Sequence, residues 1–165
     1  MVADRAVPDR AALERVEPDL ASARPVNDRT VLVVDDDDQV REITRLALEV
    51  LGGWTVVEAS DGSEAVRLVR EHQPTVVLLD VMMPKMDGPA TFAALQADPS
   101  TRHVPVVLLT AKVQVGQRQL WDGLAIAGVI AKPFSPATLS DEVDRLLEAQ
   151  ARARVDGLPE VPRSA

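Results

Sequence analysis

Carboxylate side chains follow two of the apolar runs in this sequence. Asp35 and Asp36 come directly after the run VLVV, and Asp80 ends the run TVVLLD. Carboxylates that are crowded together repel one another at neutral pH, so they need a counter-cation. Hard carboxylate oxygens in a small cleft suit Mg²⁺, which keeps several waters and accepts phosphate oxygens as further ligands. If the fold brings them together, Asp35, Asp36 and Asp80 therefore predict a Mg²⁺ site.

A hydroxyl group and an ammonium group follow two further apolar runs. Thr110 ends the run VPVVLLT, and Lys132 follows the run AGVIA. Beside a bound cation, Asp80 could act as an in-line nucleophile on a phosphoryl donor, with Lys132 and Thr110 contacting the transferred oxygens. Each of these residues alone is common as a turn, cap or rim residue. Their occurrence at several strand ends favours a site that forms an aspartyl phosphate.

Five apolar runs must supply the strands that position these side chains. The runs TVLVV, WTVVEA, TVVLL, VPVVLL and AGVIA are rich in β-branched residues and too unbroken to alternate with polar ones. Such runs are typical of strands buried on both faces, and the amphipathic segments between them predict βα units. The predicted fold class is α/β, a doubly wound parallel sheet of five strands with helices on both faces. Ligands bind such sheets at the carboxyl ends of the strands, where these polar residues lie.

The acidic run continues into the start of the first predicted helix. Apolar residues recur at three-and-four spacing from Val40 to Leu51, which predicts one buried stripe. We expect Asp37 in the loop and Asp38 at the N-cap, where a side-chain oxygen accepts hydrogen bonds from free backbone N–H groups. The last two acids of the run are therefore expected to be structural rather than metal ligands.

Composition limits the classes of function. The chain of 165 residues has a net charge of -8 and no cysteine, which excludes disulfides, thiolate metal sites and a cysteine nucleophile. The acidic balance argues against direct binding to nucleic acid. No apolar run is long enough to span a bilayer, and the N-terminus does not resemble a signal peptide. We therefore expect a cytoplasmic protein that has no membrane partner.

Prolines and scattered charges mark both ends of the chain. We expect a flexible arm over residues 1–28, one domain over residues 29–149 and a flexible tail over residues 150–165. The start of the tail is helical in pattern, so we expect it to extend the last helix by about one turn before Gly157.

Four segments of the sequence resemble the signature segments of the receiver domain of two-component response regulators. They are VLVVDDDD, VVLLDVMMPKMDG, VVLLTAK and GVIAKPF, in the family's order and with its spacing. The resemblance covers about residues 29–149 and implies a flavodoxin-like sheet with the strand order 2-1-3-4-5. It also implies that a histidine kinase or a histidine phosphotransfer protein supplies the phosphoryl group.

The resemblance further implies a role for each acidic residue. Asp80 would accept the phosphoryl group, and Asp36 would bind Mg²⁺ directly with Asp35 assisting. The backbone carbonyl of Met82 would complete the protein's share of the metal shell.

The residues around the predicted lysine follow the family with one departure. Thr110 and Lys132 would contact the phosphoryl oxygens, and the bond between Lys132 and Pro133 would be cis. Receivers commonly carry an aromatic residue three positions before this lysine, where this chain has Val129. Its β-branched side chain has few rotamers and little reach, so it cannot replace an aromatic switch.

We therefore expect the response to phosphorylation to be concentrated in the loops over residues 82–85 and 111–115. Only a short tail follows the predicted domain, which indicates a stand-alone receiver of the chemotaxis type with an unknown downstream protein target.

Two other functions are compatible with parts of the pattern. An aspartate-nucleophile phosphohydrolase would also use Mg²⁺ and an aspartyl phosphate, but it needs a second acid two residues after the nucleophile. Met82 occupies that position. A receiver-like module that only binds a partner, without phosphorylation, would not require an intact pocket. We therefore expect a signalling receiver, not an enzyme, that supports only its own phosphorylation and dephosphorylation.

Overall fold

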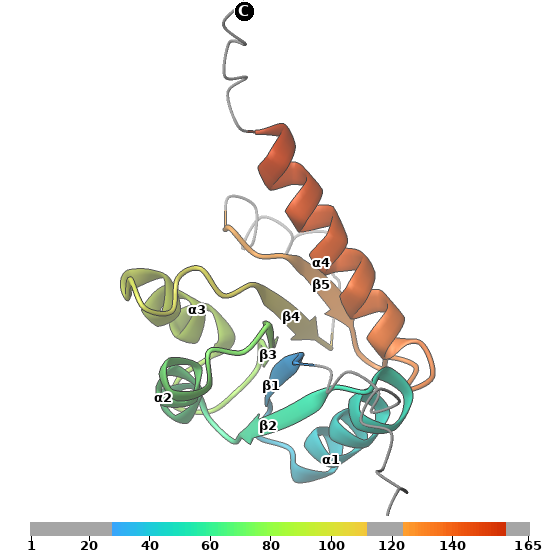
Figure 1. Cartoon of the computed structure of the whole chain (residues 1–165). Coiled ribbons are helices and arrows are strands. Elements are labelled where there is room, and N and C mark those ends of the chain that lie inside the picture. Colours follow the sequence, from blue (N-terminus) through green and yellow to red (C-terminus); the bar gives the residue numbers. More distant parts are fainter. Residues whose placement is uncertain (1–27, 112–123, 158–165) are drawn as a thin grey trace, which may run out of the picture.

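The five predicted strands form one parallel sheet in the computed structural model, which describes residues 28–111 and 124–157 (Figure 1). The strand order is β2-β1-β3-β4-β5, and every neighbouring pair is parallel. The predicted α/β fold class and strand order are therefore confirmed. The strands are β1 (Thr30–Val34), β2 (Thr55–Ala59), β3 (Val76–Asp80), β4 (Val106–Thr110) and β5 (Gly128–Ala131).

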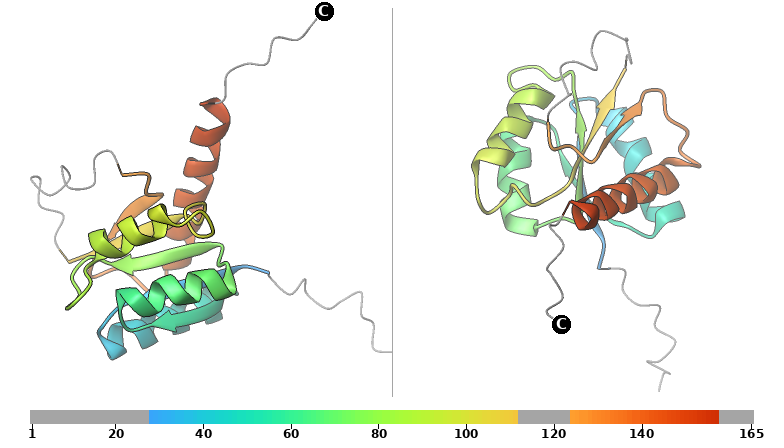
Figure 2. Two further views of the ribbon diagram at one scale, coloured as in Figure 1. Left: turned by 90° about the vertical axis from the view of Figure 1, so that its left-hand side faces the viewer. Right: turned by 90° about the horizontal axis from the view of Figure 1, so that it is seen from above.

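Helices cover both faces of the sheet. On one face lie α1, the short π-helix η3 that continues it, and α4, while α2 and α3 lie on the other. The view from above in Figure 2 shows the same layers on either side of the strands. The helices of the described residues are α1 (Asp38–Leu46), η3 (Ala47–Leu51), α2 (Gly62–His72), α3 (Gly88–Ala97) and α4 (Leu139–Asp156).

Alternate residues of each central strand enter the two cores on opposite sides of the sheet. In β1, Val31 joins a core with Leu48 of η3 and Val143 of α4. Its neighbour Leu32 joins the second core with Leu68 of α2. Because both faces are buried, the strand sequences need apolar residues at every position, which explains their unbroken apolar runs.

The first helix begins one residue earlier than predicted. The side chain of Asp37 accepts hydrogen bonds from the N–H groups of Gln39, at 2.9 Å, and Val40, at 3.2 Å. Asp37 is therefore the N-cap and Asp38 the first helical residue, so the prediction that Asp38 is the cap is wrong. The reason lies in the preceding turn, where Asp37 N–H donates to Asp35 Oδ1 at 2.9 Å and turns the chain at this point.

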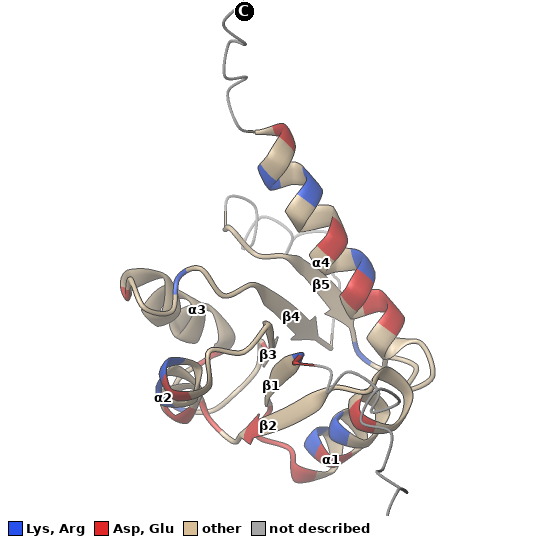
Figure 3. Ribbon diagram, in the orientation of Figure 1, with Lys and Arg blue, Asp and Glu red and all other residues tan. Residues whose placement is uncertain are grey.

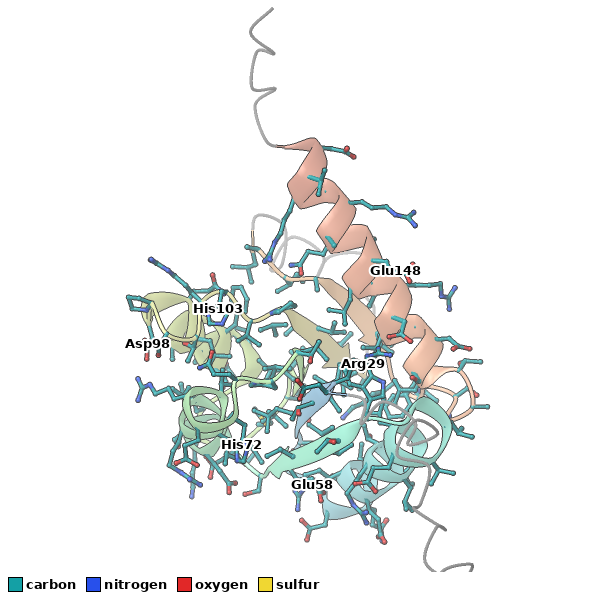
Figure 4. All side chains as sticks on the ribbon, in the orientation of Figure 1. Arg29, Glu58, His72, Asp98, His103 and Glu148 are labelled. Carbon is teal, nitrogen blue, oxygen red and sulfur yellow. The ribbon has the colours of Figure 1, made fainter. Side chains whose placement is uncertain are left out.

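A buried tryptophan joins the helix α4 to the start of the sheet. Trp54 precedes β2, is only 3% exposed, and its Nε1–H donates to Ser140 Oγ at 3.1 Å. The guanidinium of Arg29 lies 3.8 Å from the centroid of the indole ring and also pairs with Asp144 (Figure 4). This cluster lies at the amino ends of the strands, so it anchors α4 without entering the predicted site.

The last helix projects beyond the sheet in Figure 1. It continues through Asp156, so the segment predicted to be a flexible tail from residue 150 begins as helix. Its last turns are exposed, and Val155 has an exposed fraction of 67%. Within the described ranges, no helix combines the length and the apolar character needed to cross a membrane. Residues 1–27 of the predicted arm and residues 158–165 of the tail lie outside the described residues.

Candidate functional site

The predicted site residues meet at the carboxyl edge of the sheet. Asp35 follows β1, while Asp80 and Thr110 are the last residues of β3 and β4. Lys132 directly follows β5. The sheet places β1, β3, β4 and β5 next to one another in that order. The predicted convergence depended on this order. If β3, β4 and β5 lay beyond β2, that strand would separate Asp80, Thr110 and Lys132 from Asp35.

Three carboxylates form a compact cluster. One oxygen from each of Asp35, Asp36 and Asp80 lies within 4.8 Å of the others. Asp35 is 1% exposed and Asp80 is 5% exposed, whereas Asp36 lies at the surface. The carboxylates of Asp35 and Asp80 are therefore shielded from water. Repulsion between two negative charges is stronger in the protein interior than in water.

The ammonium group of Lys132 lies between the two buried carboxylates. Its Nζ donates to Asp35 Oδ2 at 2.5 Å and lies 3.4 Å from Asp80 Oδ1. The backbone N–H of Lys132 donates to the carbonyl of Thr110 at 2.7 Å, and the bond to Pro133 is cis, as the resemblance implied. Lys132 thus supplies one positive charge to a cluster that carries three negative ones.

Burial raises the pKa of Asp80. The loss of water around the carboxylate is the largest cause, and the charge of Asp35 adds to it. Lys132 and the backbone N–H of Met82 act in the opposite direction, the latter through a hydrogen bond of 3.3 Å to Asp80 Oδ1. The net rise means that ionisation of Asp80 costs more here than it does in water, and added positive charge would lower that cost.

The donor set fits Mg²⁺. The cluster offers hard carboxylate oxygens from two buried residues and one surface residue, which leaves the outer side open for water or phosphate oxygens. Asp35, Asp36 and Asp80 are the residues that would hold the ion. The backbone carbonyl of Met82 as a further ligand stays a prediction. The Met82 side chain is 73% exposed, so the thioether is not part of the buried cluster.

The loop after β3 is shaped by one glycine. A Cβ on Gly88 would lie 2.8 Å from the backbone oxygen of Asp80 and 2.8 Å from Val81 Cα. Gly88 N–H also donates to the carbonyl of Val81 at 3.1 Å, and Asp87 caps α3 by accepting from Ala90 N–H at 2.8 Å. The D-G pair therefore lets α3 start in direct contact with the backbone of the predicted phosphoacceptor.

One side chain beside the acidic loop, Arg41, is not apparent from the sequence patterns. Its Nη1 donates to the backbone carbonyl of Asp35 at 2.7 Å, and its Nε lies 3.3 Å from Glu58 Oε1 on β2. The spacing of Arg41 and Arg45 on one face of α1 is the only sequence signal for it. Its contact with Glu58 also depends on β2 lying beside β1.

Val129 occupies the position three residues before Lys132, where receivers commonly carry an aromatic residue. Val129 of β5 is half-buried, packs against the core on the α2–α3 side, and borders a shallow cavity of about 250 Å³. Residues 112–115 of the loop that we expect to respond lie outside the described residues. The predicted distribution of the response therefore stays a prediction. The cavity is lined by Val129, Ile130, Glu142, Arg145 and Leu146.

Solved structures of receivers share this architecture. The chemotaxis protein CheY4 of Vibrio cholerae has a TM-score of 0.67 and 29% identity, covering 72% of this chain and 98% of that one. The receiver domain of the sensor histidine kinase PA1611 from Pseudomonas aeruginosa has a TM-score of 0.65 and 28% identity, covering 73% of this chain and 98% of that one. That structure contains a magnesium ion in its active site cleft. The cluster of Asp35, Asp36 and Asp80 resembles a receiver Mg²⁺ site, and Mg²⁺ is the cofactor that its donor set fits.

Sequence comparison gives the same answer. The response regulator Rre1 of Synechocystis is 34% identical over 128 residues, which cover 78% of this chain and 54% of Rre1. The chain spans about half the length of the curated relatives it matches, so its action as a stand-alone receiver stays a prediction. Residues 31–144 match the family model of the response regulator receiver domain. The chain therefore belongs to the response regulator receiver domain family.

Proposed function

We propose that Asp80 is the residue that accepts the phosphoryl group in this receiver. The observation that carries the proposal is the position of its buried carboxylate, 3.4 Å from the Lys132 ammonium and within 4.8 Å of the oxygens of Asp35 and Asp36. A nucleophilic carboxylate at this position lies beside the Lys132 ammonium and beside Asp35 and Asp36, which can bind a metal cation. Asp36 is exposed, which makes it the weaker candidate, and Asp35 already has both carboxylate oxygens in hydrogen bonds.

The proposed reaction is an in-line transfer to Asp80. A carboxylate oxygen of Asp80 forms the new bond to phosphorus, and the bond from phosphorus to the donor nitrogen breaks. Lys132 then contacts a phosphoryl oxygen, and the Thr110 hydroxyl donates to another. When bound, Mg²⁺ supplies positive charge against the phosphoryl oxygens. The donor is a phosphohistidine on a histidine kinase or a histidine phosphotransfer protein.

The two alternative functions have less support. A phosphohydrolase of the aspartate-nucleophile type needs an acid two residues after Asp80, and Met82 has no proton to give. The family match is to the receiver domain of response regulators, which favours a phosphoacceptor over an enzyme that acts on a separate substrate. A module that binds a partner without phosphorylation would gain nothing from keeping two buried carboxylates, which cost stability.

The experiment that tests this function is labelling with a small-molecule phosphodonor. We expect acetyl phosphate with Mg²⁺ to add one phosphoryl group per chain, detected by intact-mass spectrometry and removed by hydroxylamine, which cleaves acyl phosphates. EDTA should prevent the label, because the crowded carboxylates need the cation before an anionic donor can approach. Equal labelling with and without EDTA, or a label that resists hydroxylamine, would contradict the proposal.

The phosphodonor protein is proposed to dock on α1. The sequence predicted that the apolar residues of α1 and η3 form one buried stripe, but four of them are exposed, so the prediction is wrong for these positions. They form an apolar surface along α1 and η3, and α1 starts beside Asp36. The nearest of them, Ile43, lies about 8 Å along the helix axis from Asp38. A partner helix that covers this apolar surface would bring its phosphohistidine to the mouth of the pocket. The exposed apolar residues are Ile43 at 50%, Leu46 at 45%, Val50 at 74% and Leu51 at 61%.

A substitution in this apolar surface should slow phosphotransfer from a protein donor and leave phosphorylation by a small-molecule donor unchanged. We expect Ile43→Glu to slow phosphotransfer from a phosphorylated histidine phosphotransfer protein by about 10-fold, since one buried apolar contact in an interface is worth about 1.4 kcal/mol or more. Labelling by acetyl phosphate should stay unchanged, because Ile43 does not contact the pocket. The matched control is Val155→Glu, at the exposed end of α4. Equal slowing by both variants, or a loss of labelling by acetyl phosphate, would exclude α1 as the docking surface.

A further inference from the structure

The guanidinium of Arg41 contacts three groups around the acidic loop. It donates to the backbone carbonyl of Asp35 at 2.7 Å and to Asp38 Oδ1 at 2.6 Å, and it lies 3.3 Å from Glu58 Oε1. Its side chain is only 16% exposed, although Asp38 is 87% exposed. Figure 3 shows basic residues of α1 beside acidic residues at the start of α1 and on β2. The contacts with Asp38 and Glu58 thus fix the guanidinium, and its Nη1 donates to the acidic loop.

The carbonyl that Arg41 holds belongs to the peptide bond between Asp35 and Asp36. The other polar atoms of Asp35 are also held, by the carbonyl of Ala59 at 3.2 Å and by the N–H of Asp37 at 2.9 Å, besides Lys132. Within the described part of the chain, the carboxylate of Asp36 has no such contact of its own. The peptide plane between Asp35 and Asp36 is therefore the part of Asp36 that neighbouring groups hold, and it fixes the backbone from which that carboxylate extends.

A second arginine on α1 supplies a natural comparison. Arg45 shares Glu58 with Arg41, at 3.4 Å, and pairs with Glu49 at 3.1 Å. Its recorded contacts within the described residues include no atom of the acidic loop. Arg41 and Arg45 therefore have the same charge, the same helix and one common partner, and they differ in the hydrogen bond to the carbonyl of Asp35.

We propose that Arg41 is a positioning residue for the Mg²⁺ site, which holds the peptide bond between Asp35 and Asp36 so that both carboxylates face the ion. The inference rests on the Mg²⁺ site formed by Asp35, Asp36 and Asp80. The sign of the effect separates this role from a simple charge effect. A positive charge near a cation site weakens metal binding, so its removal would strengthen binding if charge alone mattered. Loss of positioning has the opposite sign, because residues that orient metal ligands are typically worth a factor of about 10 to 100 in affinity.

The test measures the Mg²⁺ dissociation constant by isothermal titration calorimetry on the full chain. We expect Arg41→Gln and Arg41→Lys each to raise the dissociation constant about 10-fold. Arg41→Lys keeps the charge but loses the planar fork that reaches three partners at once, so its loss of affinity cannot come from charge. Arg45→Gln should stay within about 2-fold of the wild type. The amide spectrum of each variant without Mg²⁺ reports whether the fold is intact.

Two outcomes would overturn the inference. One is unchanged or tighter Mg²⁺ binding by Arg41→Gln, and the other is an equal loss in Arg45→Gln. Failure of the wild type to bind Mg²⁺ would instead refute the site itself. If the Arg41 variants do not fold, Glu58→Gln releases the guanidinium while leaving Arg41 in place. It should then weaken Mg²⁺ binding more than Glu49→Gln, which removes the same charge but contacts only Arg45, and equal affinities of these two variants would also overturn the inference.

Discussion

Asp80→Asn is expected to abolish labelling by acetyl phosphate and, in the absence of Mg²⁺, to stabilise the protein. The first effect follows because an amide is not a nucleophile at phosphorus under these conditions. The second follows because burial and the charge of Asp35 raise the pKa of Asp80 above 3.8. Since the folded state favours the protonated form, Asp80 contributes stability below its ordinary pKa that is lost as the pH rises through the raised value. At pH 7 the neutral amide should therefore increase the free energy of unfolding by about 1 kcal/mol.

Urea denaturation at several pH values checks the stability effect. The difference between Asp80→Asn and wild type should be largest near pH 7 and should shrink as the pH falls toward that of an ordinary aspartate. The control is Glu42→Gln, which removes an exposed carboxylate from α1 and should leave both labelling and stability unchanged. Undiminished labelling of Asp80→Asn would end the assignment of the phosphoacceptor. A metal-free variant less stable than wild type would contradict the crowding of charges.

Lys132→Met is expected to be the most destabilising change at the site. It leaves the carboxylates of Asp35 and Asp80 buried without their cation, and breaking a buried ion pair from one side typically costs about 3 kcal/mol. Mg²⁺ should restore part of this loss, because it supplies the missing positive charge. Phosphorylation should remain about 100-fold slower even with Mg²⁺, since the phosphoryl oxygen that Lys132 would contact then loses its cationic donor.

The same variant gives a test of coupling. Lys132→Met should cost less stability in the background of Asp80→Asn, because one of the two orphaned charges is then absent. Lys85→Met, which removes an exposed lysine from the loop after β3, is the matched control and should have little effect. Equal stabilities of Lys132→Met and Lys85→Met without Mg²⁺ would show that the ammonium is not balancing the buried carboxylates.

The convergence of the site was predictable because strands impose it. The carboxyl ends of parallel strands lie on one edge of the sheet, so polar residues that follow the apolar runs of neighbouring strands lie near one another. Asp80 and Lys132 needed no knowledge of side-chain conformation for this placement. The distances from Asp35 and Asp36 to the other site residues depend on the turn after β1, and so does the uneven burial of these two acids. No periodic pattern of the sequence encodes that turn.

The position of the first helix cap and the role of Arg41 could not be predicted from the sequence, for the same physical reason. Asp37 and Asp38 are equally suited to cap a helix, so their types could not say which one does, and the turn after Asp35 decided it. Arg41 was missed because its role depends on the reach of a long side chain to a backbone carbonyl. Its support comes from Glu58, a residue of β2 that lies near only after the sheet has formed. Local sequence patterns contain neither contact.

The sheet topology also determines when during folding the pocket can exist. Lys132 and Asp35 meet across 97 residues of chain, and each parallel pair of strands requires a crossover before it can form. Contacts of such sequence separation form late, because loop-closure entropy must be overcome before they stabilise anything. A growing or partly refolded chain that lacks β5 has the acids but not the lysine. The rate at which a refolding sample accepts a phosphoryl group should therefore rise only as β5 joins the sheet and brings Lys132 to the acids.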